Sequence, residues 1–299
     1  MSAGARDTLR RFLFEKHQVR GELIHLNSSV QTALANHPYD EITAALLGES
    51  LAAVALLTSI LKFEGRLTLQ LQSDGPLRLL VAQCSHHLHV RGLAQGELPE
   101  NHDATLASLA ANGRVVMTIE PEEGQRYQGI VPLEGDTLAG CLENYFARSE
   151  QLPTRLWLNA AQGEVFGMLL QKLPEESGSA PADADAWNRL TMLADTLEEK
   201  EMHTLADEQI LHRLFHEEDV RVFDREPVSF RCTCSRERVA AALRGIGREE
   251  AESLVREQGK VSTTCEFCNR LYEFDGVDVA ALFETNTPSP AGDPSSTQH

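Results

Sequence analysis

Four of the six cysteines form two close pairs near the C-terminal end of this 299-residue chain. Cys232 and Cys234 make a C-x-C pair, Cys265 and Cys268 make a C-x-x-C pair, and 30 residues lie between the pairs. Four thiolates can complete a tetrahedral shell around Zn²⁺, which leaves no position for substrate water. A domain of about fifty residues has little core of its own, so a bound metal would supply much of its folding free energy. The spacing therefore predicts a structural site for one Zn²⁺ in a small C-terminal domain, residues 228–284.

The segment between the pairs is predicted to form two short helices. Residues 236–244 can form the first, with Ser235 as its N-cap and Gly245 as its stop. Residues 248–258 can form the second, which Gly259 would end. Two helices of this length would return the chain so that the cysteine pairs meet.

The spacing of the cysteines does not by itself choose between a rigid zinc fold, a nucleic-acid-binding module and a redox switch. Thiolates are the species that peroxide and hypochlorous acid attack, and nearby positive charge favours the thiolate. Three arginines lie close to the first pair: Arg231, Arg236 and Arg238. Because each cysteine has a near neighbour, two oxidations could join Cys232 to Cys234 and Cys265 to Cys268 and expel the metal. Loss of the metal would then unfold the domain.

Residues 1–174 alternate predicted helices and strands without a fixed repeat. Residues 38–63 carry apolar side chains that are mostly three apart, which predicts a long buried helix. Asp74-Gly75-Pro76 is a turn signal between two strand-like segments, so a β-hairpin is predicted there. The other predicted elements are a strand pair at 114–119 and 127–131, a helix near 137–149, and strands near 155–158 and 165–170. This order favours an α+β domain in which helices pack on antiparallel sheets.

The next segment is strongly acidic, with 13 acidic and three basic residues between Glu175 and Asp219. Apolar residues nevertheless recur there at helical spacing: Trp187, Leu190, Leu193, Leu197, Ile210, Leu211, Leu214 and Phe215. Isolated helices of this length are marginal in water, so they would gain most of their stability from docking on a neighbour. Residues 175–227 are therefore predicted to be a metastable helical linker. The polar, proline-containing tail, residues 285–299, is predicted to be disordered.

The balance of charges argues against several classes of partner. The chain has 45 acidic residues against 27 Lys and Arg, which gives a formal charge of −18. Such a charge opposes binding to phosphate backbones and to anionic membranes. The N-terminal residues show no secretory signal, and the apolar run at 51–61 is shorter than a membrane helix requires. We therefore expect a cytoplasmic protein with no membrane and no specific nucleic acid among its partners.

The remaining two cysteines, Cys84 and Cys141, stand alone in apolar stretches and are predicted to be ordinary core residues outside the ligand set. Three histidines follow Cys84, at positions 86, 87 and 89. Ligands so close together need a further group elsewhere to complete a metal shell, and the sequence offers none. A plain strand is the favoured interpretation of this segment.

Segments outside the cysteine pairs make the chain resemble the heat shock protein 33 family of bacterial, redox-regulated holdase chaperones. They are Val19-Arg20-Gly21-Glu22-Leu23, the turn Asp74-Gly75-Pro76-Leu77, Tyr127-Gln128-Gly129-Ile130-Val131-Pro132-Leu133, and the run from Tyr145 to Thr154. All four ligand positions of that family are present, as Cys232, Cys234, Cys265 and Cys268. The resemblance spans nearly the whole chain.

The resemblance implies an N-terminal substrate-binding domain, a metastable linker and a C-terminal zinc redox switch. In such a protein the reduced, zinc-bound form is inactive. Oxidation with unfolding stress forms the disulfides Cys232–Cys234 and Cys265–Cys268, releases zinc, unfolds the linker and promotes a homodimer. The exposed surface then holds unfolding client proteins without ATP, without acting as an enzyme, and later hands them to an ATP-dependent chaperone system. The client-binding candidates are the apolar linker residues Trp187, Leu190, Leu193, Leu197, Leu211, Leu214 and Phe215.

Two other function classes compete with this interpretation. A zinc-ribbon nucleic-acid-binding protein would need a basic face, but the basic residues between 231 and 270 are nearly balanced by acidic ones. A thiol oxidoreductase would need a thioredoxin-like βαβ context, which surrounds neither pair. The nucleic-acid-binding protein is therefore the main alternative.

Overall fold

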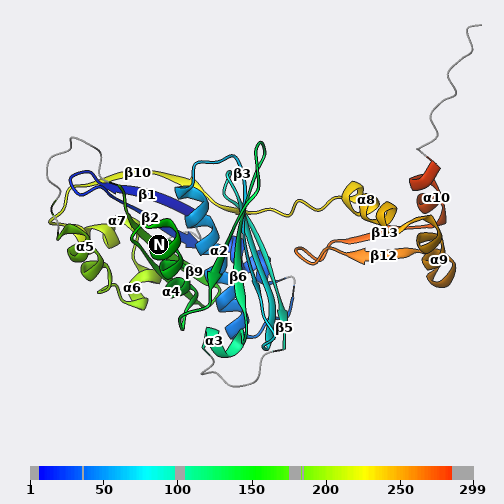
Figure 1. Ribbon diagram of the computed structural model, residues 1–299, viewed down its shortest axis with the longest axis horizontal. Coiled ribbons are helices and arrows are strands. Elements are labelled where there is room, and N and C mark those ends of the chain that lie inside the picture. Colours follow the sequence, from blue (N-terminus) through cyan, green and yellow to red (C-terminus); the bar gives the residue numbers. More distant parts are fainter. Residues whose placement is uncertain (1–6, 36, 98–104, 175–182, 184, 285–299) are drawn as a thin grey trace, which may run out of the picture. The chain divides into compact units, whose positions relative to one another are not determined.

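The computed structural model describes residues 7–35, 37–97, 105–174, 183 and 185–284. The chain divides by its internal contacts into a larger unit, Met1–Cys232, and a smaller unit, Thr233–His299. Figure 1 labels most elements of each unit. The predicted disordered tail at 285–299 and most of the predicted start of the linker lie outside the described residues.

The larger unit contains two sheets, which we call the first and the second sheet. The first sheet has the order β10-β1-β2-β9-β8, and all its neighbours are antiparallel. Its strands are β1 (Thr8–Phe14), β2 (Val19–Leu26), β8 (Thr154–Ala161), β9 (Glu164–Lys172) and β10 (Val220–Pro227). The predicted strands near 155–158 and 165–170 pair here as β8 and β9.

The second sheet has the order β11-β5-β4-β3-β6-β7 and is antiparallel except for the pair β11–β5. Its strands are β3 (Gly65–Gln72), β4 (Leu77–Ser85), β5 (His89–Gly96), β6 (Arg114–Pro121), β7 (Tyr127–Pro132) and β11 (Ser229–Phe230). The predicted hairpin around Asp74-Gly75-Pro76 is β3–β4, and the predicted pair at 114–131 is β6–β7. The α+β class with antiparallel sheets is confirmed.

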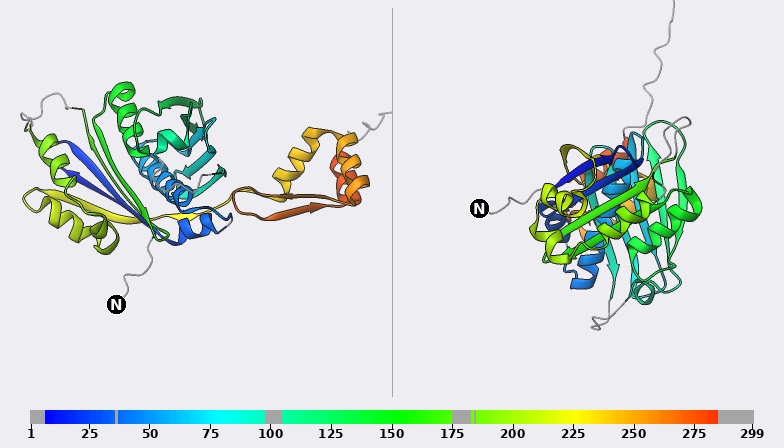
Figure 2. Two further views of the ribbon diagram at one scale, coloured as in Figure 1. Left: turned by 90° about the horizontal axis from the view of Figure 1, so that it is seen from below. Right: turned by 90° about the vertical axis from the view of Figure 1, so that its left-hand side faces the viewer.

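Helix α2 (Glu41–Ile60) contacts strands of both sheets and lies between them (Figure 2). Its N-cap is Asp40, whose carboxylate accepts a 2.9 Å hydrogen bond from the backbone N–H of Thr43. The helix is long and apolar enough to cross a bilayer, with a mean hydropathy of 1.7 over an 18-residue window. However, 67% of that window is buried inside the unit, so its composition is that of a central core helix. The helix predicted at 38–63 is thereby confirmed.

Three shorter helices complete this part: α1 (Ser28–Leu34), α3 (Leu106–Leu109) and α4 (Leu138–Tyr145). A π-helical turn, Phe146–Glu150, extends α4, so the helix predicted near 137–149 is present but changes its winding. Thr137 caps α4, because its hydroxyl accepts a 3.1 Å hydrogen bond from the N–H of Gly140.

Helices α5 (Ala186–Ala194), α6 (Glu199–Thr204) and α7 (Asp207–Phe215) cover the face of the first sheet that is turned away from α2 (Figure 2). We call α5, α6 and α7 the helical layer. Both faces of the first sheet are thus covered, which explains why most residues of β2 and β9 are buried on both sides. The helical linker predicted here ends in a strand, β10, which pairs with β1.

The smaller unit contains α8 (Arg236–Ile246), α9 (Arg248–Gln258), the hairpin β12 (Val261–Thr264) with β13 (Leu271–Phe274), and α10 (Gly276–Glu284). Ser235 caps α8 and Gly259 ends α9 in a left-handed conformation with φ 80°, as predicted. The predicted stop at Gly245 is wrong, because α8 continues to Ile246 and ends at Gly247, whose φ is 98°. A glycine inside a helix is tolerated at a cost of about 1 kcal/mol, whereas a positive φ nearly requires one.

Candidate metal centre and the helical layer

The four cysteine sulfurs predicted as ligands come together. The Sγ atoms of Cys232, Cys234, Cys265 and Cys268 all lie within 4.8 Å of one another. Sulfurs placed about 2.3 Å from a tetrahedral zinc ion are about 3.8 Å apart, so this cluster has the size of a zinc site. Its four soft ligands are also the set that structural zinc prefers. The cluster can hold one metal ion.

A tight turn places the second cysteine pair. The N–H groups of Cys268 and Asn269 donate to the carbonyl of Cys265 at 3.3 and 2.8 Å, and Asn269 has a φ of 53°. The N–H of Cys265 donates to the carbonyl of Arg270 at 3.0 Å, which closes the hairpin between β12 and β13. Asparagine is one of the few residues that adopts a left-handed conformation readily, so this turn can bring both sulfurs to one side.

Cys232 is anchored in the larger unit by its neighbours along the chain. Strand β11 runs parallel to β5, and the N–H of Arg231 continues this pairing with a 3.0 Å hydrogen bond to the carbonyl of Val90. Arg91, on β5, places Nη1 3.8 Å from the sulfur of Cys232, while its Nε donates to Gln83 at 2.8 Å. The guanidinium of Arg91 therefore places a positive charge beside this sulfur.

Tyr272, on β13, is a contact that the sequence did not reveal. Its hydroxyl donates a 3.1 Å hydrogen bond to the sulfur of Cys234. Groups that hydrogen-bond to metal ligands orient them and tune the metal. Neither Arg91 nor Tyr272 has a characteristic spacing from the cysteines, because each contact depends on strand pairing.

Cys84 and Cys141 lie outside the cluster, as predicted. Both side chains are fully buried in the core of the larger unit. Burial raises the pKa of Cys84 to about 12 and also raises the pKa of Cys141. Thiols with raised pKa values are poor nucleophiles and poor ligands at neutral pH, so these residues are packing groups.

The apolar linker residues predicted as client-binding candidates face the first sheet. Leu190, Leu197, Leu211, Leu214 and Phe215 are between 0 and 7% exposed, and Trp187 and Leu193 are partly buried against them. Their partners on the first sheet are Phe12, Phe14, Val19, Leu23, Phe166, Met168 and Leu170. The rings of Phe14 and Phe215 meet edge to face, with centroids 4.9 Å apart. Release of the helical layer would therefore expose apolar surface on both sides of this contact.

Ion pairs also attach the helical layer to the first sheet. Asp207, at the start of α7, accepts a 2.7 Å hydrogen bond from Nε of Arg225 and lies 3.6 Å from Nη1 of Arg10. Burial alone would raise the pKa of Asp207, but hydrogen bonds and charges from His25 and Arg225 outweigh it and hold that pKa well below its usual range. The carboxylate therefore stabilises the attached layer as an anion.

A second carboxylate, Glu218, links the end of α7 to its surroundings. It lies 2.8 Å from Nε2 of His17 and accepts a 2.8 Å hydrogen bond from Nε of Arg189 on α5. Burial raises its pKa, but hydrogen bonds from Arg189 and His17 outweigh this effect and lower the pKa below the usual value. Neither ion-pair cluster was predicted, because their members come from segments about 20 to 200 residues apart in the sequence.

Comparison with known proteins gives a consistent match over the chain. A sequence model described as "Hsp33 protein" matches residues 7–275. A 33 kDa chaperonin of Ectopseudomonas mendocina is 49% identical over 280 residues, which cover 93% of this chain and 95% of that protein. A 33 kDa chaperonin of Nitrosococcus oceani is 47% identical over 296 residues, covering 98% and 99% of the two chains.

A solved structure shares the fold. The crystal structure of the 33 kDa chaperonin (heat shock protein 33 homolog) from Thermotoga maritima superposes with a TM-score of 0.78 and covers 92% of this chain and 97% of that chain. The sequence identity of this pair is 24%, so the likeness concerns the fold.

Proposed function

The chain belongs to the Hsp33 family and is a molecular chaperone, and we propose that it is an ATP-independent holdase switched on by oxidation. In the reduced form, Cys232, Cys234, Cys265 and Cys268 would hold one Zn²⁺ and the helical layer would stay docked. In the oxidised form, the released layer and the uncovered sheet would bind unfolding client proteins and prevent their aggregation.

The observation that carries this proposal is the direct connection between the buried layer and the first thiol. The chain leaves α7, forms β10 along the edge of the first sheet, and reaches Cys232 five residues after Pro227. The contact between the layer and the sheet is apolar and is stabilised further by ion pairs. A surface of this kind, covered by a segment with little core of its own, is suited to reversible exposure.

The two cysteine pairs would be oxidised separately, each by the same two reactions. One thiolate of a pair attacks an oxygen of peroxide. The O–O bond breaks, a sulfenic acid forms and the other oxygen leaves as hydroxide. The neighbouring thiolate then attacks that sulfur, forms the disulfide and displaces a second hydroxide. One peroxide is consumed for each of Cys232–Cys234 and Cys265–Cys268. The disulfide sulfurs no longer bind metal, so the small domain would lose most of its folding free energy.

Each segment of the chain would have its own role. Residues 1–174 would provide the client-binding domain, residues 175–227 the metastable linker and residues 228–284 the redox switch. The oxidised form would be a homodimer and would pass its clients to an ATP-dependent chaperone system after reduction. It would turn over no chemical substrate, and it would act in the cytoplasm, where reduced thiols are the resting state.

The proposal is tested by following zinc, thiols and aggregation in one sample. Zinc content and free thiols are measured before and after peroxide treatment at elevated temperature, while light scattering reports on an unfolding client protein. We expect about one zinc to leave as four thiols disappear, with scattering suppressed only afterwards. Reductant should reverse the thiol loss. Retention of zinc together with unimpeded client aggregation would show that the metal centre is only structural.

A further inference from the structure

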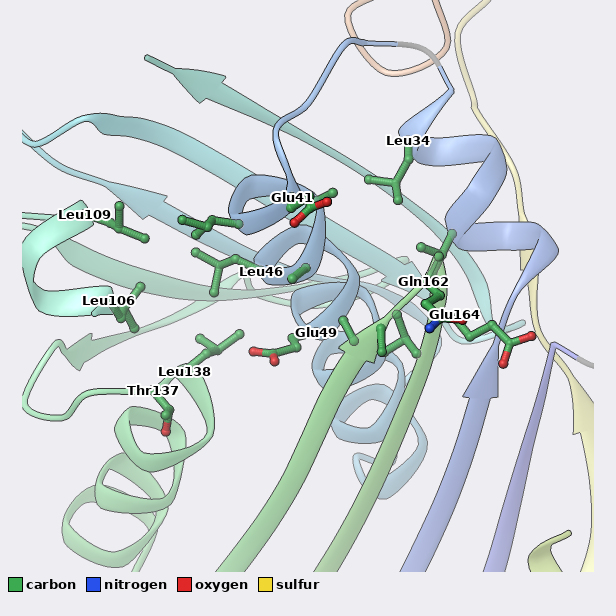
Figure 3. Close-up of a pocket in the computed structure, with 18 of the residues that line it drawn as sticks. Leu34, Glu41, Leu46, Glu49, Leu106, Leu109, Thr137, Leu138, Gln162 and Glu164 are labelled. Carbon is green, nitrogen blue, oxygen red and sulfur yellow. The ribbon is translucent and has the colours of Figure 1, made fainter. Parts of the chain in front are cut away.

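A groove with a volume of about 710 Å³ lies on the larger unit, beside the first turns of α2 (Figure 3). Its walls come from α1, α2, α3, the segment before α4 and the hairpin β8–β9. Apolar side chains dominate these walls, among them Leu34, Ile42, Leu106, Leu109 and Leu138. A volume of this size is typical of sites that bind a small molecule or a short peptide segment. The helical layer contributes no residue to the lining.

The carboxylate of Glu49 points from α2 into this groove, toward Leu138 (Figure 3). Burial raises the pKa of Glu49 to about 7. Among the residues that the structure describes, Glu49 has no hydrogen-bonding or ion-pair partner. A carboxylate removed from water without a partner is unfavourable, and a cation brought against it would stabilise it.

The other charged side chains along the groove have the same sign. They are Glu41 at the start of α2, Asp136 before α4 and Glu164 on β9. Glu164 accepts a 2.6 Å hydrogen bond from the side chain of Asn27. No Lys, Arg or His is present among the described residues of the lining. The groove therefore complements a ligand that is apolar and carries positive charge, and it disfavours an acidic one.

We propose that this groove binds an extended apolar client segment that contains one Lys or Arg, with the cation paired to Glu49. The flanking apolar side chains of the segment would pack against Leu106, Leu109 and Leu138. The inference rests on the proposed holdase function and narrows its clients to a chemical class. The groove is distinct from the surface that the helical layer covers, because the two are lined by different residues.

Three labelled peptides test the preference directly. They share the sequence Gly-Leu-Leu-X-Leu-Leu-Gly, in which X is lysine, norleucine or glutamate. Fluorescence anisotropy measures their binding to the oxidised full chain at pH 8, where Glu49 is mostly ionised. We expect the lysine peptide to bind about 10-fold more tightly than the norleucine peptide, because the ion pair forms away from water. The glutamate peptide should bind most weakly.

A pair of variants assigns the effect to the groove. Glu49→Gln keeps the size of the side chain and removes the charge, so it should abolish the preference for lysine and leave the norleucine peptide unchanged. Glu123→Gln, an exposed residue in the turn between β6 and β7, is the matched control and should retain the preference. Because Glu49→Gln replaces a half-buried, unpaired acid with a neutral side chain of the same size, the variant is expected to fold.

Equal binding of the lysine and norleucine peptides, or an unchanged preference in Glu49→Gln, would overturn the proposal. Failure of all three peptides to bind would overturn it as well. Light scattering of an unfolding client, measured with the oxidised wild-type chain, keeps this result separate from the proposed function. If the chain suppresses aggregation but does not discriminate between the peptides, the groove proposal is wrong and the holdase proposal stands. If it discriminates between the peptides but does not suppress aggregation, the holdase proposal is wrong and the groove proposal stands.

Discussion

The hydroxyl of Tyr272 on β13 lies 3.1 Å from the sulfur of Cys234 and donates a hydrogen bond to it. This contact connects the β12–β13 hairpin, which carries the second cysteine pair at its turn, to the first pair. A hydrogen bond to a thiolate withdraws electron density from sulfur, so it both orients the ligand and lowers its reactivity.

Tyr272→Phe is therefore expected to make the metal centre easier to open. The variant keeps the ring and removes the hydroxyl, which should weaken zinc binding about 10-fold and speed zinc release by peroxide. A colorimetric zinc chelator measures both quantities on the purified chain. Tyr127→Phe, on β7 in the larger unit, removes a hydroxyl that bonds to Tyr145 instead of a cysteine, and it should leave both values unchanged. Identical release rates in the two variants would remove the role given to Tyr272.

A second prediction concerns Asp207, whose side chain is 5% exposed and contacts Arg225 and Arg10. Asp207→Asn should weaken docking of the helical layer by about 2 kcal/mol, because charge-assisted hydrogen bonds are lost and both guanidinium groups keep only Glu208 as an anionic partner. The only two tryptophans, Trp157 and Trp187, both pack against this interface, so their fluorescence during urea unfolding reports on the docking. Glu226→Gln, in an exposed ion pair with Arg11, is the control.

Asp207 also determines how docking of the helical layer should depend on pH. Since the pKa of Asp207 is lowered in the folded protein, its contribution is present above the unfolded pKa of about 3.9 and is lost as the pH falls through the folded value. The wild-type chain should therefore release the layer more readily in acid, and Asp207→Asn should show a smaller acid response. An equal response in both proteins would show that other carboxylates dominate.

The predicted client surface is tested by two leucines of α7. Leu211 and Leu214 are 5 and 2% exposed and lie in the contact with the first sheet. Changing both to Ser should lower the capacity of the oxidised chain to suppress client aggregation, because apolar contact area is lost. Met192→Ser, at an α5 position that is 69% exposed, is the matched control and should have little effect. Undiminished activity of the double variant would remove these residues from the client surface.

The metal ligands and the central helix could be predicted because their signals are local. Paired cysteines need only a few residues between ligands, and α2 shows the apolar composition of a helix buried on all sides. The caps at Ser235 and Gly259 are local in the same sense. These features depend on the identity and spacing of residues within one or two turns of the chain.

Strand β10 could not be predicted, because little in its own sequence indicates a strand. All of its residues are exposed or half-buried, and Arg221, Asp224 and Arg225 interrupt any apolar alternation. Its conformation follows from pairing with β1, more than 200 residues earlier, between Thr8 and Pro227 at one end and between Phe14 and Val220 at the other. The ion pairs of Asp207 and the contact from Tyr272 depend on such long-range pairing too.

The last prediction concerns Glu22 on β2, a carboxyl group that is 2% exposed. One of its oxygens accepts a 2.6 Å hydrogen bond from the hydroxyl of Ser59 on α2, and the other has no hydrogen-bonding partner. Burial raises the pKa of Glu22 to about 8, only partly offset by Ser59 and Arg20. The group is therefore mostly protonated in the folded chain at neutral pH.

A raised pKa stabilises the fold at low pH and withdraws that stability as the pH rises. The contribution of Glu22 is fully present below its unfolded pKa of about 4.3 and is lost as the pH approaches 8. The free energy of unfolding of the wild-type chain should fall by about 2 kcal/mol between pH 6 and pH 8.5 through this group alone. Glu22→Gln should flatten the profile, since Gln can still accept from Ser59 but does not ionise. Urea unfolding at both pH values measures the difference, with the exposed Glu15→Gln as control, and an unchanged slope in Glu22→Gln would show that the carboxyl ionises freely in the folded chain.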